Sequence, residues 1–213
     1  MFKNSRFITL RDRLYRWYDI YGLYGLLKLV LNYIKTKSFS TDIRLIRFPI
    51  EIRGEKFIDW GRNLTIGKNC RIEAYPYYSR LKLIHFGSDV EINDCVHITA
   101  VYSVKIGNNV LIASKVYISD CTHGQYKGEN SDSDPNTKVG KRKLSGSPVV
   151  IEDNVWIGEF VSILPGVTIG QCSIVGSNSV VTKNVDPYTI VVGSPARPIK
   201  KYSFETNRWI KIK

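Results

Sequence analysis

The sequence predicts an all-β solenoid of parallel coils, because a six-residue repeat runs through most of its 213 residues. From residue 151 onward the chain divides into six consecutive hexads that each begin with Ile or Val. The fifth position of these hexads is small or β-branched: Val155, Val161, Val167, Ser173, Ser179 and Val185. Six residues advance an α-helix by about 600°, so no position would stay on one helical face. A short strand and a turn can repeat every six residues, and three such units close a triangular coil of ~18 residues.

The same repeat is visible upstream, where the blocks are separated by irregular spacers. Hexads begin at Ile66, Phe86, Ile92, Ile106, Ile112 and Ile118. We expect these first positions to stack inside the solenoid, because Ile and Val suit flat, fully buried strands. Gly and Asn within the hexads are expected at turns, some of them with positive φ. Residues 124–147 are rich in Gly, Ser, Asp and Lys, and they predict an extended loop that leaves the solenoid.

The first part of the chain predicts an amphipathic helix. Its apolar positions follow the i, i+3, i+4, i+7 series of one helical face: Leu23, Leu26, Leu27, Val30, Leu31 and Ile34. Charges and the pair Gly22 and Gly25 argue against a membrane span. Two interpretations remain open: a helix packed on the domain or on a sister subunit, and a basic, aromatic helix lying on an anionic membrane.

Composition limits the classes of function. Hydrophobic residues at 43% and charged residues at 23% are typical of a globular protein, and exclude a disordered or multi-span membrane chain. The net charge of +12 favours anionic partners, but no nucleic-acid motif is present, so nucleic acid is not expected. Four scattered cysteines and the lack of a cleavable signal peptide favour a cytoplasmic location. We expect a helical segment at 1–45, a β-helix at 46–192 and a tail at 193–213.

Several segments resemble the hexapeptide-repeat acyltransferases, which are left-handed parallel β-helices. They include Ser119-Asp-Cys-Thr-His-Gly, Ile163-Leu-Pro-Gly-Val-Thr-Ile-Gly and Val192-Gly-Ser-Pro-Ala-Arg-Pro-Ile-Lys. The chain looks like the branch with galactoside and maltose acetyltransferases, and most like the acetyltransferases of bacterial lipopolysaccharide O-antigen assembly. Tyr21-Gly-Leu-Tyr-Gly contributes to that closer likeness. The resemblance implies a homotrimer whose active sites are each shared by two subunits, and acetyl-CoA as the acyl donor, without a metal.

The resemblance also implies catalytic residues. His123 ends a hexad just before the predicted loop, and it matches the general base of the family; an imidazole with an ordinary pKa of about 6.5 suits that role. Asp120 could orient the imidazole or cap a turn. Asn93 matches an asparagine near the thioester carbonyl, where an amide donor stabilises an oxyanion. His97 could line the acceptor cleft or be structural. An aspartate that contacts sugar in the galactoside enzymes is replaced by Val101, so galactoside specificity is not implied.

The predicted cofactor contacts lie in the late hexads and the tail. Positions that match acetyl-CoA contacts of the family are Trp156, Glu159, Ser177, Thr182, Lys183, Arg197 and Lys200. Cations at 197 and 200 suit the phosphates of coenzyme A. Glu159 replaces a serine of the galactoside enzymes, so only its backbone is expected to contact the ligand. Trp156 could flank the pantetheine arm or pack at a coil edge.

The predicted reaction is transfer of acetyl from acetyl-CoA to a sugar hydroxyl of lipopolysaccharide O-antigen or another surface polysaccharide. The acceptor is expected to be a sugar or a lipid-linked oligosaccharide, met through peripheral contact of the helix with the cytoplasmic face of the inner membrane. The main alternative is an N-acyltransferase that acts on an amino sugar nucleotide. A γ-type carbonic anhydrase is disfavoured, because intervals of 12 and 26 residues separate the three histidines. A binding scaffold without acyl transfer would not bind acetyl-CoA.

Overall fold

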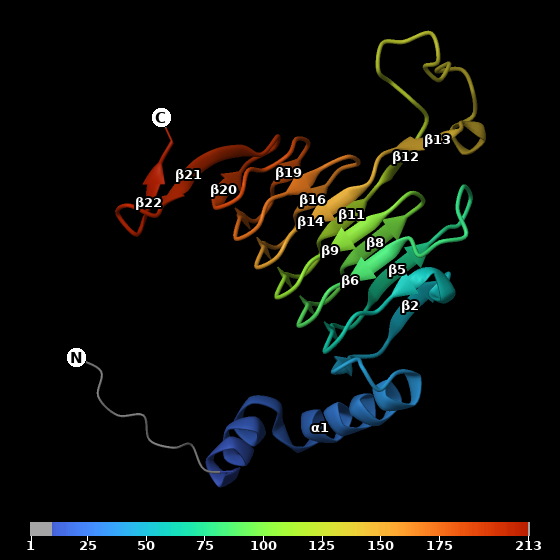
Figure 1. Cartoon of the computed structure of the whole chain (residues 1–213). Helices are drawn as coiled ribbons and strands as arrows, with labels where there is room; N and C mark the ends of the chain where they lie inside the picture. The colour runs from blue at the N-terminus through green and yellow to red at the C-terminus, as the bar shows by residue number, and fades with distance from the viewer. Residues whose placement is uncertain (1–9, 213) are drawn as a thin grey trace.

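The solenoid predicted by the hexads is the body of the molecule. In the computed structural model, which describes residues 10–212, three sheets of parallel strands form the three sides of a left-handed β-helix (Figure 1). Each coil runs from the nine-stranded sheet to the six-stranded sheet and then to the five-stranded sheet. The nine-stranded sheet consists of β1 (Leu45–Ile46), β4 (Thr65–Ile66), β7 (Glu91–Ile92), β10 (Leu111–Ile112), β15 (Trp156–Ile157), β18 (Ile174–Val175), β20 (Thr189–Val192), β21 (Arg197–Ser203) and β22 (Arg208–Lys211).

The other two sheets complete each coil. The six-stranded sheet consists of β2 (Ile50–Arg53), β5 (Cys70–Ala74), β8 (His97–Ala100), β11 (Tyr117–Ser119), β16 (Ser162–Ile163) and β19 (Val180–Val181). The five-stranded sheet consists of β3 (Ile58–Asp59), β6 (Ile84–Phe86), β9 (Val104–Ile106), β14 (Val149–Ile151) and β17 (Thr168–Ile169). A short 3-10 helix, Glu55–Phe57, precedes β3. Two corners of the solenoid therefore flank the six-stranded sheet. At one corner the chain enters the strands of this sheet, and at the other it leaves them.

The core confirms the predicted hexad positions. All six first-position aliphatics from Ile151 to Val181 are buried, and so are the fifth-position residues from Val155 to Val185. The registers show why, because Ile112 pairs with Ile157, and Ile157 with Val175, so like positions stack in columns along the axis. Each coil thereby covers the apolar interior of the next.

The turns confirm the positive φ expected at some Gly and Asn positions. Positive φ occurs at the fourth hexad position, as at Asn154 (58°) and Asn178 (59°), which suits Asn. The glycines that follow the first-position aliphatic have a different reason to be there. A Cβ on Gly158 would lie 2.7 Å from the backbone nitrogen of Ser177. Close approach of neighbouring coils, and not positive φ, requires glycine at that position.

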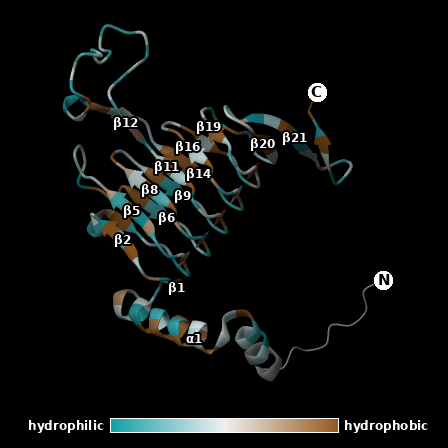
Figure 2. Ribbon diagram, turned by 180° about the vertical axis from the view of Figure 1, so that it is seen from behind, coloured by the Kyte–Doolittle hydropathy of each residue, from teal (hydrophilic) through white to brown (hydrophobic). Residues whose placement is uncertain are grey.

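The predicted helix is present as α1 (Leu10–Phe39), but its predicted apolar stripe does not pack on the solenoid. Non-helical dihedrals at Gly22 divide it into two pieces, which Figure 1 shows at an angle. Its buried side chains are polar: Thr36 has no exposed surface, and its hydroxyl accepts a hydrogen bond from the Ile46 amide at 2.8 Å. Leu23, Leu27 and Leu31 are exposed in the single chain. Hydrophobic and hydrophilic stretches follow one another along α1 (Figure 2). Among the described residues no helix is long and apolar enough to cross a membrane.

Two segments leave the prism at the corner that follows the six-stranded sheet. Residues 75–83 separate β5 from β6, and a longer excursion separates β11 from β14. The longer one begins and ends as an antiparallel pair, β12 (Cys121–His123) with β13 (Leu144–Gly146), and carries the 3-10 helix Val139–Lys141. The chain ends with β21 and β22, which extend the nine-stranded sheet with antiparallel pairings (Figure 1).

Candidate active site

His123 lies at the base of the long loop that leaves the solenoid. It is the last residue of β12 and pairs with Leu144 of β13, so both strands of the loop base fix its backbone. Its carbonyl accepts a hydrogen bond from the Tyr126 hydroxyl at 2.5 Å, and Arg142 donates to that hydroxyl at 2.8 Å. The imidazole is exposed and has no hydrogen bond or ion pair within residues 10–212. Both ring nitrogens are therefore available to a substrate.

Asp120 does not contact His123 in this structure. Its carboxylate is completely buried and accepts hydrogen bonds from three successive backbone amides, those of Val101 (2.9 Å), Tyr102 (2.8 Å) and Ser103 (2.7 Å). Burial raises the pKa of this carboxyl, and the three N–H donors oppose that shift. In this structure the carboxylate caps the 101–103 turn, and no hydrogen bond joins it to the imidazole of His123.

The turn that Asp120 holds connects the two excursions. Tyr102 stacks on Tyr78 of the 75–83 segment, with ring centroids 5.4 Å apart, and its hydroxyl donates to the Leu144 carbonyl at 3.3 Å. Since Leu144 is the residue paired with His123, these two rings form an aromatic wall beside the loop base. This pair could not be predicted from the sequence, where its one signal is the cluster of tyrosines after Ala74. Val101 is buried in the same turn, so its side chain is not available to a sugar.

Asn93 lies at the opposite end of the six-stranded sheet. It follows β7, in the turn that leads into β8, whereas His123 follows β11. Because β8 and β11 are parallel neighbours, one residue precedes the sheet and the other comes after it. A single chain therefore does not bring Asn93 and His123 together.

The six-stranded sheet holds a buried carboxylate that the sequence did not predict. Glu73, on the outer face of β5, has a 3% exposed side chain and accepts hydrogen bonds from Arg71 (2.8 Å) and His97 Nε2 (2.9 Å). Burial alone would raise the pKa of Glu73, but these bonds and one from the Tyr75 hydroxyl outweigh it and lower the pKa. Arg71 and His97 are paired in register on neighbouring strands, and this pairing brings the groups together. No motif within the sequence predicts such a contact.

The predicted cofactor residues fall into separate groups. Glu159 and Ser177 lie on the corner that precedes the six-stranded sheet, where the Asn178 amide donates to the Glu159 carbonyl at 2.8 Å. Thr182 and Lys183 follow β19 on the other corner. Arg197 begins β21 and is exposed.

Trp156 and Lys200 share one row of the nine-stranded sheet. Trp156 pairs with Ile174, Ile174 with Ile190, and Ile190 with Lys200. Trp156 is 50% exposed on the outer face of the nine-stranded sheet. Neighbouring strands are ~4.8 Å apart, so about 14 Å separates the two residues along the axis.

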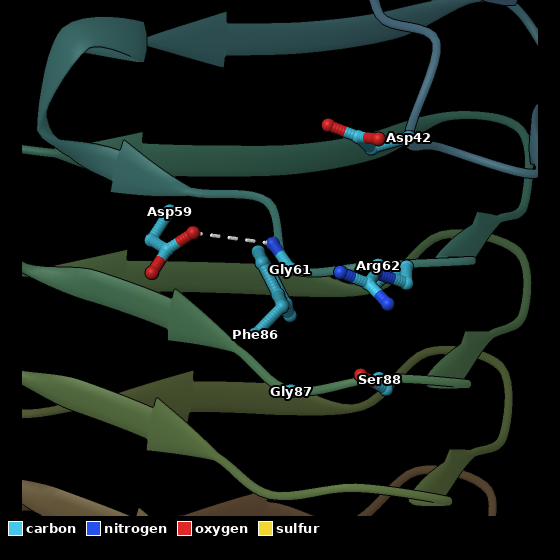
Figure 3. A pocket seen from close by; sticks show the side chains of 7 residues that line it. All are labelled: Asp42, Asp59, Gly61, Arg62, Phe86, Gly87 and Ser88. Carbon is cyan, nitrogen blue, oxygen red and sulfur yellow. Dashed lines mark hydrogen bonds between the residues drawn. The ribbon is translucent and has the colours of Figure 1, made fainter.

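A hollow of about 340 Å³ lies elsewhere, on the corner that precedes the nine-stranded sheet (Figure 3). It is lined by Asp42, Asp59, Gly61, Arg62, Phe86, Gly87 and Ser88. The Gly61 amide donates to Asp59 at 3.3 Å within it. None of the predicted site residues lines this hollow. Within residues 10–212, no group of three His, Cys, Asp or Glu side chains is arranged to hold a metal ion.

Comparison with known proteins gives the class. Residues 148–183 match the family model described as bacterial transferase hexapeptide (six repeats). WbbJ of Escherichia coli (strain K12), named as a candidate lipopolysaccharide biosynthesis O-acetyl transferase, is 43% identical over 90% of this chain and 95% of its own length. The galactoside O-acetyltransferase of the same strain is 36% identical over 64% of this chain and 63% of its length.

Two solved structures share the fold. The hexapeptide-repeat acetyltransferase VCA0836 of Vibrio cholerae, complexed with acetyl coenzyme A, has a TM-score of 0.54 at 24% identity and covers 95% of this chain and 93% of its own. A point mutant of the N-acyltransferase AntD from Bacillus cereus, in complex with dTDP-4-amino-4,6-dideoxyglucose and coenzyme A, has a TM-score of 0.65 at 22% identity and covers 81% of this chain and 90% of its own.

The fold and the hexads define an acyltransferase built on a left-handed β-helix. The chain belongs to the hexapeptide-repeat acetyltransferase family.

Proposed function

We propose that the protein transfers acetyl from acetyl-CoA to a sugar hydroxyl of lipopolysaccharide O-antigen or another surface polysaccharide. The observation that carries the proposal is the exposed imidazole of His123 at the base of the long loop, which has no hydrogen-bond partner among residues 10–212. The likeness to WbbJ over nearly the whole chain supports the choice of acceptor.

His123 is the general base of the proposed mechanism. Its imidazole takes the proton of the sugar hydroxyl while the oxygen attacks the thioester carbonyl. The C–S bond then breaks, and the imidazolium returns its proton to the sulfur of coenzyme A. The products are an acetyl ester and the free thiol, with no covalent acyl-enzyme. An amide donor from Asn93 would stabilise the oxyanion that forms in between.

The site is proposed to lie between two subunits of a homotrimer. Asn93, Glu159 and Ser177 occupy one corner of the six-stranded sheet, and His123, Thr182 and Lys183 the other. Within one chain these two corners lie on opposite sides of the sheet strands and do not meet. When two chains pack side by side, one corner of the first chain can face the other corner of the second across a groove. Trp156 and the cations Arg197 and Lys200 then suit the pantetheine and phosphates of acetyl-CoA.

The proposal predicts one acetyl group fewer per repeating unit of surface polysaccharide in a strain that lacks the gene. Mass spectrometry of the purified polysaccharide, with and without a plasmid copy, measures this loss. In a second assay, the purified protein supplied with acetyl-CoA should release coenzyme A faster with hydroxyl acceptors than with amino sugar nucleotides. The opposite preference would replace this proposal with N-acyl transfer, and an absence of acetyl-CoA binding in calorimetry would leave only a scaffold.

The helix α1 is proposed to hold the enzyme on the cytoplasmic face of the inner membrane. Leu27 and Leu31 are exposed on it, and Lys28 and Lys35 lie between and beside them. Apolar side chains with neighbouring cations suit an anionic bilayer surface. This location would bring the site to a lipid-linked oligosaccharide.

Vesicle sedimentation tests this contact without removing Thr36, which anchors the first coil. The whole protein should sediment with vesicles that contain phosphatidylglycerol, and the double substitution Leu27→Ser, Leu31→Ser should lower the bound fraction at least about threefold. The matched control is Leu81→Ser, which removes an exposed leucine from the 75–83 segment. Equal binding of all three proteins would rule out this role for α1.

A further inference from the structure

The imidazole of His97 is held in place by a buried carboxylate. Its Nε2 donates to Glu73 Oε2 at 2.9 Å, and the Glu73 side chain is 97% buried, so the carboxylate has a fixed position. Arg71 and Tyr75 donate hydrogen bonds to the other oxygen, Oε1. The ring of His97 therefore has one orientation, set by its neighbours on the same sheet face.

The other ring nitrogen remains available. Nε2 makes the contact to Glu73, and within residues 10–212 Nδ1 has no hydrogen-bond partner. The His97 side chain is 30% exposed. The ring of Tyr117, its in-register neighbour on β11, lies 5.4 Å away at 55° and is itself partly exposed. An aromatic face next to an oriented polar nitrogen is a surface that a sugar ring can use, since its C–H face packs on the aromatic and a hydroxyl binds the nitrogen.

The position of the pair links it to the proposed site. His97 begins β8, four positions after Asn93, on the corner that also holds Glu159 and Ser177. His123 lies beyond the far end of the same sheet. In a site shared by two subunits, the corner of one chain that carries Asn93 faces the corner of the next chain that carries His123. His97 would then lie beside the reacting groups, on the subunit that contributes Asn93 and not the general base.

The surrounding charges decide which kind of sugar fits. Arg53 and Arg71 both approach Glu73 and Glu51: Arg53 forms ion pairs with the two carboxylates, and Arg71 does the same. Two cations therefore face two anions, and no excess positive charge remains for an acidic sugar. Because the positive and negative charges cancel, this surface favours a neutral sugar ring that carries hydroxyl groups.

The geometry points to His97 and Tyr117 as an acceptor subsite for a neutral sugar residue, with Nδ1 of His97 binding a hydroxyl and Glu73 as the positioning residue. This inference rests on the proposed function, because it names the acceptor half of the same site. Val101 is consistent with it: this valine is buried in the 101–103 turn, so acceptor contacts must come from other residues.

Substitution of His97 by glutamine tests the subsite with little risk to the fold. A glutamine amide reaches the place of Nε2 and still donates to Glu73, but it offers nothing at the place of Nδ1. The acceptor in this assay is de-O-acetylated surface polysaccharide. His97→Gln should raise the KM for this acceptor about fivefold to tenfold, because it removes one hydrogen bond to a neutral group. The kcat and the KM for acetyl-CoA should change less than about twofold.

The matched control is His85→Gln. His85 is a partly exposed histidine of β6 whose Nε2 donates to the Lys82 carbonyl at 3.1 Å, and it lies on the five-stranded sheet away from both corners of the site. All its kinetic constants should stay at the level of the unsubstituted protein. Glu73→Gln should reproduce the KM increase of His97→Gln in part. His97→Asn, whose amide oxygen can accept a hydrogen bond at the place of Nδ1, should regain some of the lost affinity.

Three outcomes would overturn the inference. The first is an unchanged acceptor KM in His97→Gln. The second is an altered oligomeric state of that variant in sedimentation, which would make His97 a subunit contact. The third is faster turnover of a methyl uronoside than of the matching neutral methyl glycoside, which would contradict the neutral ligand. If the unsubstituted protein acetylates no sugar hydroxyl, the proposed function itself fails, and that result is distinct from the other three.

Discussion

Replacement of His123 by alanine is expected to abolish acetyl transfer while acetyl-CoA still binds. General base catalysis typically contributes 10²- to 10⁴-fold, so the variant's kcat should fall by about that factor. Acetyl-CoA affinity should be retained, because none of the residues that match cofactor contacts is removed. Calorimetry with acetyl-CoA and a thiol-release assay with the acceptor measure the two quantities separately.

The same variant should keep its fold. The His123 side chain is exposed and has no hydrogen-bond partner within the described residues, and the loop base is held through its backbone. Thermal unfolding of His123→Ala should therefore match that of the unsubstituted protein, and His85→Ala serves as the control for loss of a surface imidazole. Turnover within about threefold of normal in His123→Ala would remove His123 from the mechanism.

The solenoid could be predicted because its information is local and repeated. A column such as Ile112, Ile157 and Val175 needs the same residue type at the same hexad position in every coil, and that periodicity is visible without any structure. The role of Gly158 could not be seen in the same way. Its constraint comes from Ser177, one coil later, so only the register between coils shows that there is no room for a Cβ.

The site was less predictable, because it depends on contacts between segments far apart in the chain. His123 could be singled out since it precedes a break in the repeat. Glu73 looked like an ordinary strand residue, and only its register neighbours give it a buried network with Arg71 and His97. The predicted stripe of α1 shows the opposite case, where a strong local pattern faces solvent in the single chain because the helix contacts the first coil through Thr36. Helical periodicity indicates which residues share a face, but it does not say what covers that face.

Asp120 is expected to be the most costly single polar side chain to remove. Asp120→Ala leaves the amides of Val101, Tyr102 and Ser103 without their acceptor in a site closed to water. Each unsatisfied buried donor costs about 1–3 kcal/mol, so the free energy of unfolding should fall by about 3 kcal/mol or more, a large share of the 5–15 kcal/mol typical of a domain. Urea unfolding followed by circular dichroism measures the loss.

A second carboxylate in the same excursion provides the control. Asp132 also accepts backbone hydrogen bonds, from Lys127 at 2.8 Å and Gly128 at 2.7 Å, but it does so in the exposed loop. Water can replace it there, so Asp132→Ala should cost less than about 1 kcal/mol. A loss in Asp120→Ala no larger than this would show that the 101–103 turn is held by other contacts.

Asp120→Asn separates the structural role from a catalytic one. Its amide oxygen still accepts from part of the turn, so stability should lie between those of the unsubstituted protein and Asp120→Ala. Because the carboxylate points to the 101–103 turn and not to His123, the pH at which activity is half-maximal should not move in this variant. If Asp120→Asn kept full stability yet lost activity as severely as His123→Ala, with a displaced pH profile, the carboxylate would have to orient the imidazole during turnover. Stability and pH profile together therefore decide between the two roles.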